Sequence, residues 1–403
     1  MSYLQKRSAK YTAPQEAKKA GMYPYFRVIE SGQDAEVEMK GNKISMFGSN
    51  SYLGLTSHPK VKEAAIKAIR KYGTGTAGSR FLNGTLDIHI ELEERLARFV
   101  NKEAAIAFAT GFQSNLGAIP TIIGRNDVAV IDEQCHASII DATRLSFGRI
   151  LKYRHNDLES LEKVLKNLEN GNTSNGLRII ITDGLFSMEG DIAKLDGIVK
   201  LANEFNCSVL VDDAHGLGVL GNNGAGTVDH FGLNDQVEMI VGTFSKSLAS
   251  VGGFVASSKE IINFLQHNAR SLIFSASMPP SSAASVIAAL DIIETEPQHV
   301  ERLWENTHHA ISRFKDLGVD IGNSETPIIP VYIRNNEKAF MISQMLLDAG
   351  VFVNPVISPA VPPEESLLRF SIMATHTIDQ IDHAIDTIMT LEKKLDIFST
   401  TRA

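Results

Sequence analysis

The sequence has little cysteine and lacks the apolar leader of a secreted protein. Cys135 and Cys207 are its two cysteines in 403 residues, too few for a disulfide framework or a four-thiolate metal site. The first nineteen residues are polar and contain no apolar run of signal-peptide length. These absences favour a reducing compartment, and we expect a cytoplasmic protein.

The chain also has no convincing membrane span. Residues 271–290 carry no charge and have about the length of a span, but six serines and the Pro279–Pro280 pair interrupt them. Prolines there would leave backbone groups unpaired in lipid. The pattern predicts a loop followed by a buried helix from about Ser281.

Basic residues are in deficit. Lys and Arg number 39 and Asp and Glu number 47, so the formal net charge is −8. This balance argues against duplex nucleic acid or an anionic membrane as the main partner, while a small phosphate-bearing ligand stays open. At roughly 150 residues per domain, the length predicts two or three domains.

Short apolar runs alternate with amphipathic helices from about residue 59. Helical periodicity is clear over Val61–Tyr72 and Ile88–Phe99. The runs that we predict as buried strands are Ala104–Ala109, Val128–Ile131, Arg178–Thr182, Cys207–Val211, Met239–Gly242 and Gly253–Ala256. This alternation predicts an α/β fold with a mostly parallel sheet covered on both faces, whose ligands gather at the carboxyl ends of the strands.

The pattern changes from about Ser281 onward to that of a smaller α+β domain. Its predicted elements are helices over Ser282–Glu296, Pro297–Leu317 and Glu337–Leu347, strands at Ile328–Ile333 and Arg369–Met373, and a final helix after Thr377. Weak strand signals at Glu36–Met39 and Ile44–Phe47 suggest that the first fifty residues dock onto this domain. We predict residues 1–55 as an N-terminal arm contributing to the small domain, 56–285 as the large domain and 286–403 as the C-terminal small domain.

The densest chemical signal is the segment Asp212-Asp213-Ala214-His215, which directly follows an apolar run. Two carboxylates beside an imidazole suit a divalent metal, acid/base catalysis or a cationic ring nitrogen, and the segment alone leaves these open. Residues 216–221 match G-x-G-x-x-G, but turn formers follow where a dinucleotide fingerprint must open a helix. A nicotinamide cofactor is therefore disfavoured.

Lys246 stands between two apolar runs, among the small hydroxyl residues Thr243, Ser245 and Ser247. Small neighbours leave room for a bulky ligand on the amine, and lysine can form a Schiff base. Taken alone, a structural lysine is an equal alternative. Upstream, Gly111 opens a predicted helix whose backbone N–H groups suit an anion, and His136 follows another strand.

These features occur in the order anion cradle, histidine, Asp/His pair and lysine, each after a different strand. That layout resembles fold-type I pyridoxal 5'-phosphate (PLP) enzymes, and from Tyr25 to about Glu392 the chain is similar to the α-oxoamine synthase family. The segments that carry the resemblance are Asn50–Leu55, Gly73–Arg80, Asn83–Thr85, Thr182–Asp191, Asp212–His215 and Thr243–Ser247. The resemblance implies an aminotransferase-like fold with PLP bound to the large domain, and no metal.

The resemblance also implies roles for individual residues. Lys246 would hold PLP covalently and move protons at the substrate Cα. Asp212 would pair with the pyridine nitrogen, His215 would hydrogen-bond the phenolic oxygen and His136 would stack on the ring. Asp213 is expected to be structural.

The remaining implied contacts concern the phosphate and the substrate. The phosphate would be held by the N–H groups of Gly111 and Phe112, by Thr243, and by Ser275 or Ser277 of a second subunit, with Ser187 as a further cofactor contact; Arg369 and Asn50 would bind the amino-acid carboxylate. Shared contacts of this kind imply an obligate homodimer.

The reaction implied is a decarboxylating condensation of an amino acid with an acyl-CoA thioester. The segments Phe244–Ser250, Arg80–His89 and Phe370–Thr377 are similar to those of soluble bacterial members that condense L-serine with palmitoyl-CoA to 3-oxosphinganine, the first step of sphingolipid synthesis. The alternatives are a glycine C-acetyltransferase, another member of the family, or a noncatalytic partner subunit. We expect a soluble homodimer, with peripheral contact to the inner membrane left open.

Overall fold

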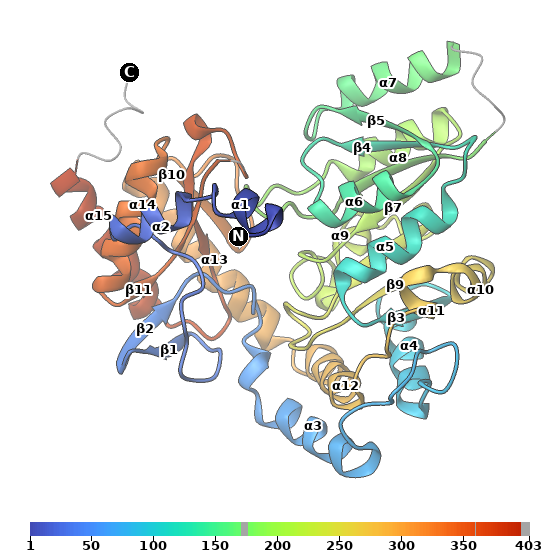
Figure 1. Cartoon of the computed structure of the whole chain (residues 1–403), viewed down its shortest axis with the longest axis horizontal. Coiled ribbons are helices and arrows are strands. Elements are labelled where there is room, and N and C mark those ends of the chain that lie inside the picture. The colour runs from blue at the N-terminus through green and yellow to red at the C-terminus, as the bar shows by residue number, and fades with distance from the viewer. Residues whose placement is uncertain (171–175, 359, 396–403) are drawn as a thin grey trace. The chain divides into compact units, whose positions relative to one another are not determined.

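The computed structural model describes residues 1–170, 176–358 and 360–395, which fall into two compact units (Figure 1). The large unit is Asn50–Trp304, and the small unit combines Met1–Ser49 with Glu305–Ala403. The small unit is therefore built from both ends of the chain.

The large unit contains a seven-stranded sheet with helices on both of its faces (Figure 1). Its strands are β3 (Ala104–Phe108), β4 (Val128–Asp132), β5 (Arg149–Tyr153), β6 (Arg178–Asp183), β7 (Ser208–Asp212), β8 (Met239–Thr243) and β9 (Gly253–Ser257). Its helices are α3 (Pro59–Tyr72), α4 (Asp87–Phe99), α5 (Gly111–Ile122), α6 (Ala137–Leu145), α7 (Leu158–Asn170), α8 (Leu195–Glu204), α9 (Thr227–His230), α10 (Lys259–Asn268), α11 (Arg270–Ile273) and α12 (Pro280–Thr295).

The sheet confirms the predicted alternation. Its strand order is β3-β9-β8-β7-β6-β4-β5, and β9 runs antiparallel to both of its neighbours while the other pairs are parallel. All six predicted strands are present. The prediction missed β5, because this edge strand carries exposed charged residues at Arg149 and Lys152 and so lacks a continuous apolar run.

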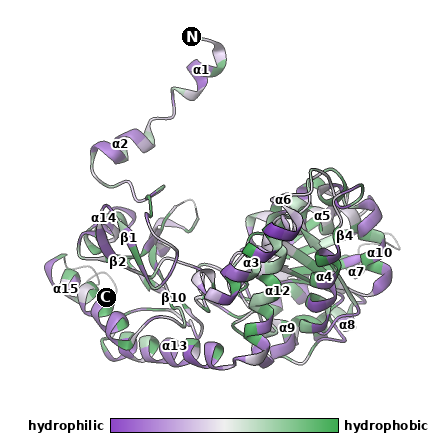
Figure 2. Cartoon of the chain, turned by 90° about the horizontal axis from the view of Figure 1, so that it is seen from below, coloured by the Kyte–Doolittle hydropathy of each residue, from purple (hydrophilic) through white to green (hydrophobic). Residues whose placement is uncertain are grey.

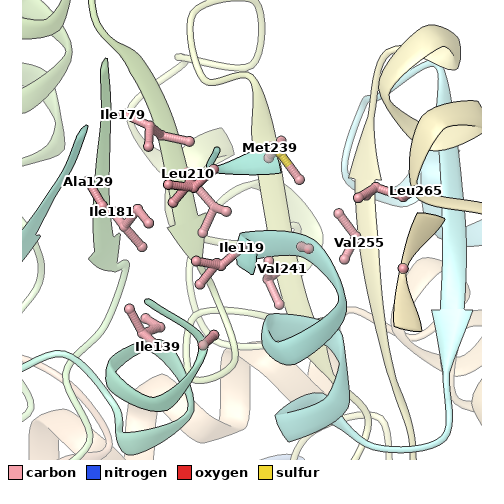
Figure 3. Packing of buried hydrophobic residues seen from close by; sticks show 14 of the residues in the cluster. Ile119, Ala129, Ile139, Ile179, Ile181, Leu210, Met239, Val241, Val255 and Leu265 are labelled. Carbon is pink, nitrogen blue, oxygen red and sulfur yellow. The ribbon is translucent and has the colours of Figure 1, made fainter. Parts of the chain in front are cut away.

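The core of the large unit lies between this sheet and the helices α5, α6, α10 and α11. Ile181, Leu210 and Val241 come from three adjacent strands, and Ile119 and Ile139 pack on them from helices (Figure 3). Each such side chain contributes about 1.5–3 kcal/mol when fully buried. The helices carry hydrophilic residues on their outer sides and hydrophobic ones toward the sheet (Figure 2).

Residues 271–290, which carry no charge, form the predicted loop followed by a buried helix. The chain leaves α11, passes through an irregular segment over 274–279, and enters α12 with Pro280 in its first turn. Nine residues of α12 are buried, and the helix packs on α3 and α4. In the part of the chain that the structure describes, no helix is both long and apolar enough to cross a membrane.

The unit boundary differs from the predicted one. A division at 285/286 would cut through α12, whose buried face belongs to the large unit, so the large unit extends to Trp304. Its beginning at Asn50 likewise includes residues that we predicted in the arm. The boundary between Trp304 and Glu305 falls within helix α13 (Gln298–Asp316).

The small unit contains two three-stranded sheets, β1-β2-β11 and β10-β13-β12. Its elements are α1 (Tyr3–Ser8), α2 (Ala13–Lys19), β1 (Glu36–Met39), β2 (Asn42–Met46), β10 (Ile328–Tyr332), α14 (Asn336–Asp348), β11 (Val351–Phe352), β12 (Asn354–Val356), β13 (Leu367–Ser371) and α15 (Ile378–Leu395). Strand β2 pairs in parallel with β11, which joins the N-terminal segment to the C-terminal one.

Candidate active site

A cavity of about 320 Å³ opens in the large unit at the carboxyl ends of β4, β6, β7 and β8. Among the residues that line it are seven candidates from the sequence: Gly111, Phe112, His136, Asp212, His215, Thr243 and Lys246. They meet because parallel strands place the residues that follow them at one edge of the sheet. The sheet topology therefore gathers residues that lie as far as 135 positions apart, from Gly111 to Lys246.

Asp212, the last residue of β7, is held by two donors. Asn115 on α5 donates from Nδ2 to Asp212 Oδ2 at 2.6 Å, and the Ala214 N–H donates to Oδ1 at 3.1 Å. The carboxylate is 5% exposed and lies on the cavity wall. A buried carboxylate fixed in this way suits a cationic ring nitrogen.

The neighbouring Asp213 faces a different environment. Its two oxygens accept the N–H and the hydroxyl of Thr227, each at 2.6 Å. Burial raises the pKa of Asp213 to about 6, against the opposing effect of these hydrogen bonds. These contacts with Thr227 agree with the structural role expected of Asp213.

Among the described residues, no group of three or more His, Cys, Asp and Glu side chains is arranged to hold a metal.

His215 is oriented by a tyrosine that sequence reasoning left without a role. The Tyr52 hydroxyl lies 2.7 Å from His215 Nδ1 and 3.5 Å from Asn50 Oδ1. Tyr52 is completely buried, so its hydroxyl depends on these polar neighbours. The candidate Asn50 does not line the cavity itself but reaches His215 through this hydroxyl.

His136 is the N-cap residue of helix α6 and is anchored through both its ring and its backbone. Its Nδ1 lies 2.7 Å from Ser138 Oγ, and its N–H donates to Asp183 Oδ2 at 2.9 Å. Burial lowers the pKa of His136, and the positive charge of Lys246 acts in the same direction while Asp212 opposes it. The imidazole is therefore neutral at pH 7, which suits stacking on an aromatic ring.

Lys246 lies in the loop between the antiparallel strands β8 and β9. The loop is closed by the Phe244 N–H donating to Gly252 O at 3.0 Å and the Ser250 N–H donating to Phe244 O at 2.9 Å. Gly252 has φ +144, and a Cβ there would lie 2.5 Å from the Phe244 ring. Glycine is thus required where this loop turns back into β9.

The predicted anion cradle is present at the start of α5. Thr110 caps the helix by accepting the Gln113 N–H at 3.1 Å, and Gly111 follows on the cavity wall. A Cβ at Gly111 would lie 2.6 Å from Thr243 Oγ1, so glycine lets the helix start approach this hydroxyl. Backbone N–H groups and a hydroxyl therefore converge on one place, as a phosphate requires.

Asp183 is a cavity carboxyl that the sequence analysis did not assign. It is the last residue of β6, pairs in register with Asp212, and is 4% exposed. Burial and the charge of Asp212 raise the pKa of Asp183 well above its usual range. Its place at a strand's carboxyl end, the same signal that identified Asp212, could have revealed it.

Four predicted contacts lie elsewhere. Ser187 is in a turn after β6, and Ser275 and Ser277 are in the segment before α12; none of them lines the cavity. Ser275 Oγ instead accepts from Gln113 Nε2 of α5 at 3.2 Å. Arg369 belongs to the small unit, where it is buried on β13 and donates to Ser371 Oγ at 2.7 Å.

The segment 216–221 also differs from a dinucleotide loop. Gly218 and Gly221 adopt positive φ values of 74° and 78°, and a short 3-10 turn over Asn222–Gly224 follows them. Because no long helix begins there, its N–H groups do not form a pyrophosphate site.

Comparison with known proteins decides the family. The model of the aminotransferase class I and II family matches residues 42–388. The chain belongs to this family. It is 56% identical over 98% of both chains to a serine palmitoyltransferase of Sphingobacterium spiritivorum, and 53% identical to one of Bacteroides ovatus over 98% of this chain and all of that one.

A solved structure extends the family assignment to the fold. The serine palmitoyltransferase of S. paucimobilis with a bound PLP–myriocin aldimine matches with a TM-score of 0.93 and 34% identity, covering 98% of this chain and all of that one. The resemblance to fold-type I PLP enzymes is thus confirmed, and the family member described here is PLP-dependent.

The cavity fits this cofactor by its own chemistry. It offers a lysine amine, a fixed carboxylate for the pyridine nitrogen, a neutral imidazole for the ring face, and an uncharged phosphate cradle at Gly111 and Thr243. This cradle needs no lysine or arginine, because helix N–H groups bind phosphate without a counter-charge.

Proposed function

We propose that the protein condenses L-serine with palmitoyl-CoA to give 3-oxosphinganine, CoA and carbon dioxide. The observation that carries the proposal is the convergence of Lys246, Asp212, His215 and His136 in one cavity, in a chain whose relatives over nearly its whole length are serine palmitoyltransferases. The cofactor would be PLP, which when bound accepts the electron pair left at the serine Cα as its proton departs.

Lys246 is the residue that holds the cofactor and moves the Cα proton. Lys246 lines the cavity. The backbone hydrogen bonds of its loop hold the lysine backbone in place. With PLP and serine bound in the cavity, the Lys246 amine would lie within reach of the substrate Cα. Lys246 can therefore take the proton from one face and return it after decarboxylation.

Asp212, His215 and His136 hold the ring in one orientation. The Asp212 carboxylate, fixed by Asn115, accepts the pyridine N–H and keeps that nitrogen protonated. His215, oriented by Tyr52, hydrogen-bonds the phenolic oxygen, and the neutral His136 covers one ring face. These three contacts, from the ends of β4 and β7, would exclude water from the ring and restrict its tilt.

The outer contacts are assigned from the family pattern. The N–H groups of Gly111 and Phe112 and the Thr243 hydroxyl hold the phosphate, with Ser187 as a further contact. Arg369 binds the serine carboxylate, because a guanidinium can bind a carboxylate bidentately, and Asn50 supports it. These contacts orient the substrate and leave the acyl thioester free to approach the Cα.

We also propose a homodimer with shared active sites. The exposed large apolar side chains of the large unit include Phe81, Leu82, Phe112, Val251 and Phe274. Phe112 and Val251 line the cavity, and Phe274 precedes Ser275 and Ser277, the residues assigned to the neighbouring subunit's phosphate. A second copy that covered this surface would bury the apolar groups and complete each site.

Product analysis tests the activity. Purified protein supplied with PLP, L-serine and palmitoyl-CoA should release CoA and form 3-oxosphinganine, detected by mass spectrometry. A panel of glycine, alanine and serine against acetyl-CoA and palmitoyl-CoA measures selectivity. Efficient turnover of glycine with acetyl-CoA, and none of serine with palmitoyl-CoA, would instead identify a glycine C-acetyltransferase.

Two further measurements test assembly and location. Light scattering should give the mass of two chains, and mixing Lys246→Ala with Ser275→Ala/Ser277→Ala chains should restore one complete site per hybrid dimer. We place the protein in the cytoplasm. Cell fractionation would contradict this if the protein sedimented with membranes after a high-salt wash, and salt-sensitive recovery with inner-membrane vesicles would indicate peripheral contact.

A further inference from the structure

An imidazole outside the cavity links two of the loops that build it. His155, two residues after β5, has Nδ1 3.1 Å from Asp132 Oδ1 and Nε2 3.5 Å from Asp191 Oδ2. Desolvation alone would lower the pKa of His155, but the hydrogen bond to Asp132 and the nearby charges of both carboxylates raise it to about 10. The ring is therefore an imidazolium at neutral pH, placed between two acids.

Asp132 connects this imidazolium to the loop that carries His136. It is the last residue of β4 and is fully buried, and besides His155 it accepts the N–H groups of Gln134 at 2.9 Å and Asn156 at 2.8 Å. These bonds hold the turn between β4 and His136. The position of the His136 ring thus depends on a carboxylate whose cationic partner is His155.

Asp191 connects the same imidazolium to the loop that follows Asp183. This loop closes on itself, with Phe186 N–H donating to Asp191 O at 2.9 Å and a bridge between Leu185 and Ile192. The Phe186 ring stands edge-on to His155 at 4.4 Å between centroids. Asp183 in turn accepts the His136 N–H, so the two loops meet at the cavity wall.

We propose that His155 is a positioning residue: its bridge from Asp132 to Asp191 holds the loops after β4 and β6 at a set spacing, and so fixes the His136 ring and the Asp183 carboxyl against the cofactor. The inference rests on the PLP site proposed above. Asn156 makes a parallel uncharged link, donating from Nδ2 to Ile192 O at 3.0 Å.

The charged link has a property that the uncharged one lacks. Two carboxylates, one of them fully buried, would repel each other across this gap, and the cation between them converts repulsion into attraction toward both loops. Glutamine at 155 would keep a hydrogen-bonding side chain but remove the charge. The spacing of the loops should then relax, while the fold of the sheet stays intact.

The test compares His155→Gln with His309→Gln. His309 forms a similar histidine–carboxylate pair with Asp382 at 2.7 Å in the small unit, so its variant controls for loss of such a pair away from the site. For His155→Gln we expect the PLP dissociation constant, measured by absorbance titration of the apoprotein, to rise about tenfold or more. The visible circular dichroism of bound PLP, which reports the tilt of the ring, should change in amplitude.

A second variant protects the test against misfolding. Asp191→Asn removes one end of the bridge at a position that is partly exposed, and should move PLP affinity and dichroism in the same direction. The double variant should be little worse than either single one, since both break one bridge. Wild-type affinity and dichroism in both single variants, or equal changes in His309→Gln, would overturn the inference. A wild-type protein that binds no PLP would instead overturn the proposed function.

Discussion

The central sheet has a cavity at each end of the same strands, and the two differ in chemistry more than in size. The carboxyl-end cavity measures about 320 Å³ and the amino-end cavity about 270 Å³. The second is lined chiefly by apolar residues that include Ile122, Leu177, Ile179, Met239, Ile261 and Phe264. Volume alone would not distinguish them.

The difference follows from strand direction. At the carboxyl ends each strand passes into a loop or a helix start, so Asp132, Asp183, Asp212 and Thr243 end their strands beside the N–H groups of α5 and α6. At the amino ends the strands begin, and residues there line the second cavity together with Ile261 and Phe264 of α10. Parallel topology therefore concentrates polar chemistry at one edge and leaves the other to packing.

The largest expected effect is that of Lys246→Ala. Removing the amine should lower kcat/KM by about 10³-fold or more and abolish the visible absorbance of a lysine-bound cofactor. The exposed Lys200 on α8 provides the control, and Lys200→Ala should keep both properties. Retained turnover in Lys246→Ala would remove the carboxyl-end cavity from consideration as the active site.

Asp212→Asn should have the next largest effect. An amide cannot keep the pyridine nitrogen protonated, so we expect kcat to fall by about 10²-fold or more. The adjacent Asp213→Asn is the matched control, because that side chain bonds Thr227 and does not line the cavity. Equal loss of kcat in the two well-folded variants would contradict the assignment.

Asp213→Asn should instead change the pH dependence of stability. The pKa of Asp213 is about 6 in the folded chain, above its ordinary value, so the folded state binds the extra proton and this group's contribution to stability falls as pH rises from about 4 to 6. The asparagine variant should lack this decline. Chemical denaturation at pH 4.5 and 7 measures it, and an unchanged pH slope would contradict the prediction.

Tyr52→Phe should have a smaller effect. Loss of the hydroxyl leaves His215 Nδ1 without its 2.7 Å partner, and we expect about a tenfold loss in kcat with a shift of the cofactor's visible absorbance. Tyr332→Phe, which removes a hydroxyl from the small unit, is the control. A change confined to melting temperature would show that Tyr52 serves packing alone.

The smallest effect is expected at the amino-end cavity. Phe264 is 47% exposed, so Phe264→Ala should cost about 1 kcal/mol of stability or less and leave turnover unchanged. A thermal melt and a steady-state assay measure the two quantities. Loss of turnover in this variant would mean that the two ends of the sheet are coupled.

Local patterns identified most of the strands and the main cavity residues. Continuous apolar runs mark strands buried on both faces, which is why β4, β6, β7 and β8 were predicted and the edge strand β5 was missed. The residue after each run marks the functional edge. Asp183 directly follows its predicted strand, as Asp212 does, but it was overlooked because no second carboxylate or imidazole stands beside it in the sequence.

The residue types and their order along the chain by themselves predicted the fold class and pointed to Lys246, Asp212, His215 and His136, which line one cavity, as candidate site residues. Only the tertiary structure shows why Asp212 faces the cavity and Asp213 does not, because the two carboxylates differ in the partners that folding brings to them. It also decided the environments of Tyr52 and His155. Tyr52 is 163 positions from His215 in the sequence, and His155 is 23 and 36 positions from Asp132 and Asp191. No local sequence pattern specifies contacts over such separations.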